Sequence, residues 1–466
     1  MRVSFSKIKI TPKDFIGRPM AGYTRKHPCL GKLDDIFAYG VLIVGKSERS
    51  ELLLISLDLL KIPIALCDYI KRKIKKKDPS LEADQILIHC THTHSAPDLT
   101  GEFHWPGGLF NVMKGIMFGS NCSDDYIVWF VYQIVKMVGH LKNNLIPCKM
   151  AWTKKKFNPD IVVNRRHPIR RSIPELGVIN FINIDNNNLI GLIINYSCHP
   201  TTLSFQNNKL SADYPGKVIE RVSQLTNNNV GVIFFNGTSG DLNPITTCGT
   251  DYKKLDLDKS LIYGQLGTYN HTKKIGYIIA EEALNLAKSL AKDDYMDELE
   301  FQFYLNIFWI PMKDFKYFSK TWFRNKFNYA IKKYLLLKVA KIILNDANFP
   351  TFSIKRKGLK IHGKTVIQFI KFNFNDEKKS QSFGIMAVPG ELFEEYGDLF
   401  LKKSPTGKNN SFIFQNSNDW ISYLFPAKDY IKEGGYEPLA SFSPICGYFI
   451  ENKMFELFKE IKNKNN

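Results

Sequence analysis

Short apolar runs alternate with longer amphipathic segments over the first 300 residues of the chain. Six of the runs have the length and apolar character of strands. They cover residues 40–45, 52–57, 86–90, 176–182, 189–196 and 230–235. Three amphipathic segments predict helices, at 62–77, after Ser123 and at 275–291. Mixed strands and helices predict an α/β fold, with mixed β-sheets flanked by helices.

The pattern changes after residue 300. Between 300 and 352, aromatic residues alternate with Lys and Arg, and a strand-like pattern then resumes. No internal repeat, low-complexity tract or long linker divides the chain. We therefore expect a single composite domain over residues 1–466, with an aromatic and basic insertion around 300–352.

The charge balance of the chain is strongly basic. It has 64 Lys and Arg against 45 Asp and Glu, a net charge of +19. Such an excess attracts nucleic acid, anionic lipid or acidic substrates, although lysines that simply cover the surface give the same count. No zinc-finger spacing, RNA-binding signature or helix-turn-helix pattern accompanies the charge, so we expect no nucleic-acid partner.

The first residues, Met1 to Phe15, lack the apolar core of a signal peptide. No run of 18 apolar residues predicts a transmembrane helix. The eight cysteines include no CxxC pair, which favours reduced thiols over a disulfide framework. We expect a cytoplasmic protein that can contact a membrane peripherally.

Polar motifs follow three of the predicted strands, at 91–95, 197–201 and 236–241. Ligand sites in open α/β sheets gather outside the carboxyl ends of strands, so the three motifs can converge on one pocket. His92 and His94 point to the same side if that segment is extended, and His199 follows a second strand. Neutral imidazoles are common zinc ligands. Two alternatives stay open: the pair can be ordinary polar loop histidines, and His199 can be a buried histidine hydrogen-bonded to the backbone. Asp213 is either a helix cap or a carboxylate that orients a metal-bound histidine.

A series of short motifs resembles the neutral/alkaline non-lysosomal ceramidase family, in that family's order, from residue 10 to about 447. The motifs are Ile10-Thr11-Pro12, Pro19 to Tyr23, Thr91 to Ser95, Asn164-Arg165, His199-Pro200-Thr201, Ser211 to Gly216, Gly240-Asp241, Pro389-Gly390-Glu391 and Tyr423 through Gly435-Tyr436-Glu437. Single motifs are weakly specific, but their ordered set covers nearly the whole chain. The resemblance implies a ceramidase-like catalytic domain.

The resemblance also implies one catalytic Zn²⁺ per chain. By motif match its ligands fall on His92, His199, Glu391 and Tyr423. Two imidazoles, a carboxylate and a phenol leave room for a water whose pKa the metal lowers towards neutrality. The implied reaction is hydrolysis of a linear N-acyl amide, with ceramide (N-acylsphingosine) giving a fatty acid and sphingosine.

Further residues receive roles from the same resemblance. His94 matches a second active-site histidine that passes a proton to the leaving amine. Arg165 and Tyr436 are placed to stabilise the developing oxyanion. Asp213 and Asp241 are expected either to orient the side chains that bind the metal or to have a structural role.

The sequence departs from the family pattern at one informative position. The family's Gly-Asp-Val-Ser-Pro segment reads Gly240-Asp241-Leu242-Asn243-Pro244 here. A serine role at Asn243 is excluded, which favours metal-activated water over a serine nucleophile. Longer family members carry a signal peptide and a C-terminal immunoglobulin-like domain, and we expect neither in this chain.

Two other function classes compete with this interpretation. One is a metal-dependent amidohydrolase of TIM-barrel type, acting on a small soluble amide, although that fold requires eight βα units. The other is a non-catalytic, basic membrane-surface binding protein. The segment from Trp309 to Lys338 suits either lipid headgroups or packing on the core, and the basic run Lys71 to Lys77 can add long-range attraction.

Overall fold

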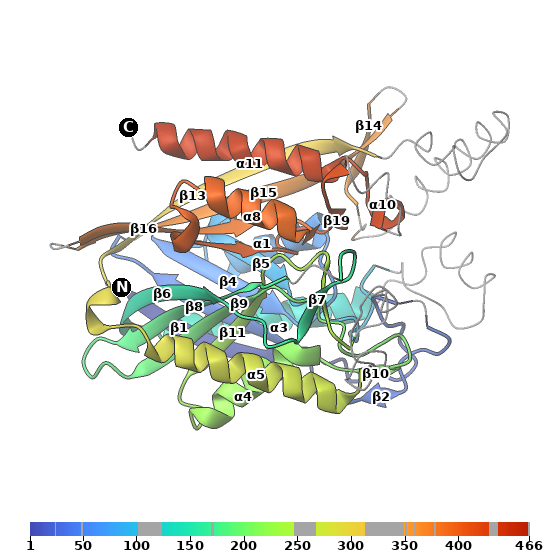
Figure 1. Cartoon of the computed structure of the whole chain (residues 1–466), viewed down its shortest axis with the longest axis horizontal. Helices are drawn as coiled ribbons and strands as arrows, with labels where there is room; N and C mark the ends of the chain where they lie inside the picture. The colour runs from blue at the N-terminus through green and yellow to red at the C-terminus, as the bar shows by residue number, and fades with distance from the viewer. Residues whose placement is uncertain are drawn as a thin grey trace.

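A long mixed sheet, built from the N-terminal half of the chain, organises the fold (Figure 1). The computed structural model describes residues 1–23, 25–47, 50–100, 124–168, 172–246, 267–312, 349, 352–357, 360–376, 379–427 and 437–464. The sheet has eight strands in the order β11-β9-β8-β6-β1-β3-β4-β5. They are β1 (Arg2–Lys9), β3 (Phe37–Val44), β4 (Glu51–Leu57), β5 (Ile86–Cys90), β6 (Ile146–Lys156), β8 (Glu175–Asn183), β9 (Leu189–Tyr196) and β11 (Gly231–Asn236). Only the end pairs β11–β9 and β4–β5 are parallel.

A second sheet follows in the C-terminal part of the chain. It contains β13 (Leu299–Pro311), β14 (Ile354–Lys357), β15 (Lys360–Asp376), β16 (Lys379–Ala387) and β18 (Ser411–Phe414). Three two-stranded pairs complete the strands: β2 (Gly31–Lys32) with β10 (Lys209–Leu210), β7 (Val162–Asn164) with β12 (Leu242–Pro244), and β17 (Glu391–Leu392) with β19 (Tyr423–Leu424). Aromatic and aliphatic side chains from both large sheets meet in one hydrophobic core.

Helices cover the outer faces of both sheets. The helices α1 (Ile64–Lys77) and α3 (Asp124–Asn143) share a core with β3, β4 and β5, while α4 (Asp213–Leu225) and α5 (Tyr269–Lys288) pack on β8 and β11. In Figure 1, α8 (Glu394–Lys403) and α11 (Cys446–Asn463) lie over the second sheet, and α10 (Glu437–Ala440) is a short turn near β19. Short 3-10 turns occupy Ala83–Gln85, Lys292–Asp294 and Lys408–Asn410.

The two ends of the long sheet approach each other. Ser56 Oγ in β4 donates a hydrogen bond to the carbonyl oxygen of Phe234 in β11, at 2.8 Å. The Asn236 N–H donates to His89 Nε2 at 3.1 Å, and His89 Nδ1 lies 2.9 Å from Ser56 Oγ. Burial holds the pKa of His89 well below its usual value, so its neutral ring can donate from Nδ1 and accept at Nε2. These contacts bring the carboxyl ends of β5 and β11 together, although the strands lie at opposite ends of the sheet.

The predicted α/β class is confirmed, and most predicted elements agree with the structure. The helix predicted at 275–291 begins earlier, at Tyr269, because the Thr268 side chain caps the backbone N–H of His271. The many antiparallel pairs of the long sheet exclude the TIM-barrel alternative, which requires parallel strands throughout. No helix among the described residues is long and apolar enough to span a bilayer.

Candidate metal centre

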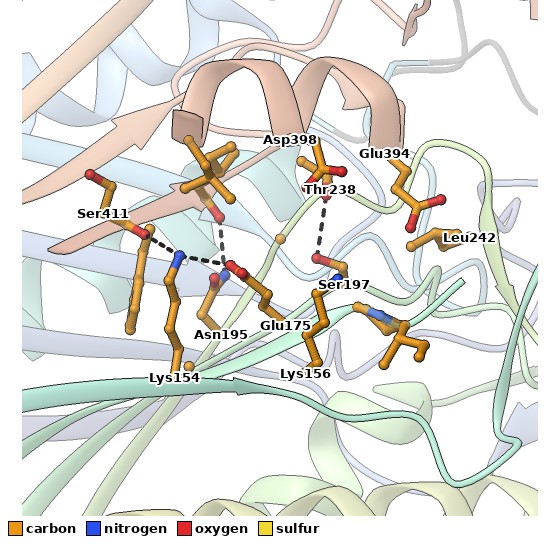
Figure 2. A pocket seen from close by; sticks show the side chains of 17 residues that line it. Lys154, Lys156, Glu175, Asn195, Ser197, Thr238, Leu242, Glu394, Asp398 and Ser411 are labelled. Atoms are coloured by element: carbon orange, nitrogen blue, oxygen red, sulfur yellow. Dashed lines mark hydrogen bonds and ion pairs between the residues drawn. The ribbon is translucent and has the colours of Figure 1, made fainter. Parts of the chain in front are cut away.

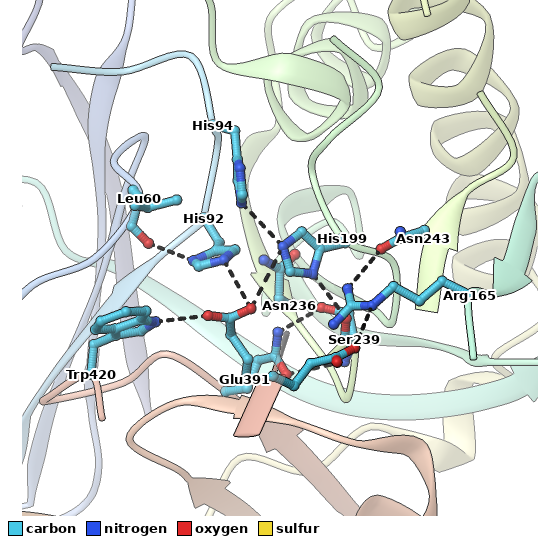
Figure 3. Close-up of polar contacts among 12 residues, drawn as sticks. Leu60, His92, His94, Arg165, His199, Asn236, Ser239, Asn243, Glu391 and Trp420 are labelled. Atoms are coloured by element: carbon cyan, nitrogen blue, oxygen red, sulfur yellow. Dashed lines mark hydrogen bonds and ion pairs between the residues drawn. The ribbon is translucent and has the colours of Figure 1, made fainter. Parts of the chain in front are cut away.

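Three histidines from two strand ends converge on one buried point. His92 and His94 follow β5, and His199 follows β9. Their ring centroids lie 4.7 to 5.1 Å apart, and one nitrogen of each lies within 4.8 Å of the others. All three side chains are buried. Figure 3 shows them gathered around one point. The expected convergence of the HxH motif with His199 is therefore present.

Backbone carbonyls hold two of the rings in place. His92 Nδ1 lies 2.7 Å from the Leu60 carbonyl oxygen, and His199 Nδ1 lies 3.0 Å from that of Ser239. Since a carbonyl oxygen can only accept, each Nδ1 carries the proton and each Nε2 presents a lone pair. This is the arrangement in which histidines bind a metal, with the partner of the second nitrogen fixing ring and tautomer.

Glu391 supplies a carboxylate to the same point. Its Oε1 accepts a hydrogen bond from Trp420 Nε1 at 3.1 Å. Its buried Oε2 has no hydrogen-bond partner and lies 3.4 Å from His92 Nε2 and 3.7 Å from His199 Nε2. Figure 3 shows the carboxylate directed at both rings.

The protonation states of these groups suit a cation. Burial lowers the pKa of His199 to about 3 and holds that of His94 well below its usual value, so both imidazoles are neutral near pH 7. Burial alone raises the pKa of Glu391. The positive charge of Arg165, and of His92 and His199 when they are protonated at low pH, outweighs it and brings the pKa to about 2, so the carboxylate is ionised near pH 7. Lone pairs and a carboxylate oxygen that face each other repel, and a divalent cation between them removes the repulsion. The donor set therefore fits Zn²⁺.

His94 was expected to move protons, but its ring lies as close to the other two imidazoles as a metal ligand does. Its Nε2 is 3.1 Å from His199 Nε2, while its buried Nδ1 has no hydrogen-bond partner. Tyr23 packs against the ring, with centroids 4.7 Å apart. The three imidazoles thus form a second possible ligand set beside the predicted one with Glu391 and Tyr423.

Strand pairing places Tyr423 next to Glu391. It is the register partner of Glu391 in the parallel pair β17–β19, and its side chain is buried. The Arg165 guanidinium lies 5.2 Å from the centroid of its ring. This places Tyr423 beside both Glu391 and the predicted oxyanion-binding group.

Arg165 is held by polar partners around its guanidinium. Nε donates to Glu437 Oε1 and Nη1 donates to Asn243 Oδ1, each at 3.2 Å. Arg166 Nη1 donates to the other oxygen of Glu437, at 2.9 Å. Asn243, which stands where the family has serine, thus contacts Arg165. Glu437 belongs to the last motif of the sequence analysis, but its pairing with Arg165 has no signal in the sequence.

The two aspartates have structural partners. Asp241 accepts hydrogen bonds from Asn164 Nδ2 at 2.8 Å and from the Glu394 N–H at 2.9 Å, which connects the Arg165 loop to the start of α8. Asp213 accepts from the Leu203 and Tyr214 N–H groups. Ala212, and not Asp213, occupies the cap position of α4. Carbonyl oxygens, not these carboxylates, contact the ring Nδ1 atoms of His92 and His199.

Some predicted site features fall elsewhere. Tyr436 lies outside the described residues, as does most of the segment from Trp309 to Lys338. The contacts of Trp420 with Glu391, of Leu60 with His92 and of Ser239 with His199 were not predicted. No sequence motif marks an indole N–H or a backbone carbonyl as part of a site.

A separate cavity of about 170 Å³ lies between strands β6, β8 and β9 of the long sheet and helix α8 (Figure 2). Its charged lining is partly paired, since Lys154 Nζ contacts Glu175 Oε2 at 2.7 Å and the Ser411 carbonyl. Ser197 and Thr238 line it beside each other. Among the described residues that line this cavity none is a histidine, so it is distinct from the histidine cluster.

Comparisons with known proteins bear on the fold. No protein-family model matches the sequence, and a search of curated proteins found no match. Among solved structures, the chain is similar to the neutral ceramidase of Pseudomonas aeruginosa, with a TM-score of 0.72 and 16% identity over 99% of this chain and 74% of that one. It is also similar to a ceramidase complexed with C2, with a TM-score of 0.71 and 15% identity over 99% and 75% of the two chains. The protein has a neutral ceramidase-like α/β fold.

Proposed function

We propose that this protein is a zinc-dependent amidase that hydrolyses a linear N-acyl amine, with ceramide as substrate and a fatty acid and sphingosine as products. One observation carries the proposal. The Nε2 atoms of His92 and His199 and the unpaired Oε2 of Glu391 converge in a buried site of a neutral ceramidase-like fold.

We assign the ion to His92, His199, Glu391 and Tyr423, with one Zn²⁺ per chain. Zinc bound there lowers the pKa of a water towards neutrality and polarises the scissile carbonyl. The rings are fixed by the carbonyls of Leu60 and Ser239, so little reorganisation accompanies binding.

The remaining groups act on the substrate. Arg165 stabilises negative charge on the carbonyl oxygen when water adds to the acyl carbon, and Tyr436 is the second proposed donor to that oxygen. His94, neutral and buried, takes a proton from the attacking water and delivers it to the amide nitrogen. The C–N bond then breaks, the hydroxyl stays with the acyl group, and the amine leaves.

We further propose that residues 1–466 work as one catalytic domain. His92 and His199 follow strands of the first sheet, whereas Glu391 and Tyr423 follow strands of the second. Neither sheet alone holds the proposed ligand set. We also propose a cytoplasmic protein with peripheral access to lipid, without a nucleic-acid partner.

A panel of N-acyl amines tests the proposed function. Purified protein is incubated with ceramides of different acyl lengths and with short, water-soluble amides, and the released fatty acid is measured. We expect release from the lipid amides, loss of release with a chelator, and recovery with Zn²⁺. Turnover of only the small amides would favour the soluble-amide alternative. No turnover of any amide by the zinc-loaded protein would favour a binding protein.

A further inference from the structure

Three neighbouring loops expose large apolar side chains at one edge of the molecule. Ile16 is 61% exposed, Leu30 58% and Phe205 45%. The loops are joined by backbone hydrogen bonds, because the Gly17 N–H donates to Cys29 O at 2.8 Å and the Leu30 N–H donates to Asn208 O at 2.7 Å. The small sheet β2–β10 connects the same segments and lies at the periphery in Figure 1.

The same loops carry an excess of positive charge. Lys13, Lys26 and Lys209 are exposed and form no ion pair with any carboxylate in the described part of the chain. The other three cations of these loops are engaged. Arg18 pairs with Asp14, Lys32 pairs with Asp35, and the buried Arg25 donates to backbone carbonyls. Around the apolar side chains, three lysine charges therefore remain for a partner outside the chain.

The loops that form this edge also contact His94. Tyr23, between Ile16 and Leu30 in sequence, packs on the His94 ring. Arg25 donates to the His94 carbonyl and, from Nε, to Asn207 O at 2.8 Å, so it joins both loops to His94. Gly22 has a φ of +93°, and a Cβ there would lie 2.4 Å from His94 Cγ. The exposed loop tips and the catalytic histidine thus belong to one packed unit.

We propose that this edge, defined by Ile16, Leu30, Phe205, Lys13, Lys26 and Lys209, docks on the surface of an anionic lipid bilayer. Apolar side chains inserted at headgroup level, surrounded by lysines that meet anionic lipid, are the usual composition of a peripheral membrane contact. The purpose of the contact rests on the proposed function, because a substrate with a long acyl chain resides in the bilayer. Docking at this edge places the loops that touch His94 at the lipid surface.

Vesicle binding by the full-length protein tests the proposal. Co-sedimentation is measured with phosphatidylcholine vesicles and with vesicles that also contain phosphatidylserine. One variant combines Ile16→Ser, Leu30→Ser and Phe205→Ser, and a second combines Lys13→Gln, Lys26→Gln and Lys209→Gln. A matched control, Ile307→Ser with Tyr448→Ser, removes side chains of comparable exposure, 51% and 57%, from the second sheet and α11.

We expect the wild type to bind the anionic vesicles more tightly than the neutral ones, and more weakly as salt increases. The apolar variant should lose at least about tenfold in binding to both vesicle types. The lysine variant should lose about fivefold per lysine on anionic vesicles alone. The control should bind as the wild type does, and the melting temperatures should show that all variants are folded.

Two results would overturn the proposal: absence of vesicle binding by the wild type, or equal loss in the apolar variant and the control. Neither result depends on turnover, so the test remains informative if the proposed function fails. If that function holds, both edge variants should keep full activity on a short, water-soluble N-acyl amine. They should lose it only on ceramide presented in anionic vesicles.

Discussion

Glu391 and Tyr423 are register partners in the two-stranded parallel sheet β17–β19. The Glu391 N–H donates to Ser422 O at 3.0 Å, and the Phe393 N–H donates to Leu424 O at the same distance. This short ladder fixes the spacing between the carboxylate and the tyrosine. It provides a physical reason why two motifs 32 residues apart in sequence lie side by side.

The first prediction concerns the ligands themselves. His92→Ala and His199→Ala should each lose the bound zinc and all amidase activity, because the remaining donors are too few to hold the ion. Elemental analysis of the purified variants measures the loss, with one zinc per chain expected in the wild type. Full zinc content in both variants would refute the ligand assignment.

His94 separates the two possible ligand sets. If it moves protons, His94→Ala retains zinc and loses turnover. If the three imidazoles are the ligands, His94→Ala loses zinc, whereas Glu391→Gln retains it. Elemental analysis of these two variants therefore decides between a site with Glu391 and one with three histidines.

Trp420 provides a second prediction. Its indole N–H holds Glu391 Oε1, which leaves Oε2 directed at His92 and His199, and Lys61 Nζ lies 4.0 Å from the centroid of its ring. Trp420→Phe keeps most of the ring but removes the hydrogen bond, so zinc affinity should fall by about 10- to 100-fold. Competition with a chromophoric chelator measures the affinity.

Trp152→Phe is the matched control for this experiment. Trp152 Nε1 also donates a hydrogen bond, to Asn410 Oδ1 at 3.1 Å, but its ring packs on Phe374 and Phe383 and not beside Glu391. Trp152→Phe should therefore leave the zinc affinity unchanged. Equal losses in the two variants would point to a general effect on stability and would exclude a positioning role for Trp420.

The third prediction assigns Arg165 to the substrate. Arg165→Ala should retain zinc but lose about 10²- to 10³-fold in kcat, the usual cost of removing one oxyanion donor. Arg166→Ala is the control for this variant, because Arg166 also pairs with Glu437. If Arg166→Ala has the same effect, the charge balance of Glu437 explains the loss. Unchanged kcat in Arg165→Ala would exclude the proposed role.

The sequence contained enough to predict the class of fold and the meeting of three histidines. Strand patterns and the motifs that follow them are local, so 91–95 and 197–201 could be recognised without a structure. The motifs do follow strand ends, as expected. The sequence did not reveal how strands from opposite ends of the sheet come together: β4 and β5 are joined to β11 through Ser56, His89 and Asn236.

Other parts of the site could not be predicted from the sequence. The carbonyls of Leu60 and Ser239 orient the two histidines, and a backbone carbonyl is the same at every residue. The unpaired Oε2 of Glu391 is a consequence of tertiary packing. The docking edge depends on which apolar side chains stay exposed, which the spacing of Ile16, Leu30 and Phe205 does not reveal.

The last prediction tests how tightly the His94 loop is packed, and it uses two glycines of similar backbone conformation. Gly22 and Gly17 have φ values of +93° and +82°, a region that costs an L-residue about 1–2 kcal/mol. A Cβ at Gly17 meets nothing within 4 Å, whereas one at Gly22 would lie 2.4 Å from His94 Cγ. Gly17→Ala should therefore lose only the backbone cost in its free energy of unfolding and keep full activity. Gly22→Ala has the same backbone cost but must also displace the His94 ring, so turnover should fall strongly in a protein that still folds. Denaturant unfolding and kcat on a soluble amide measure the two effects separately. If the two variants were equally active, the contact between Gly22 and His94 would not constrain catalysis.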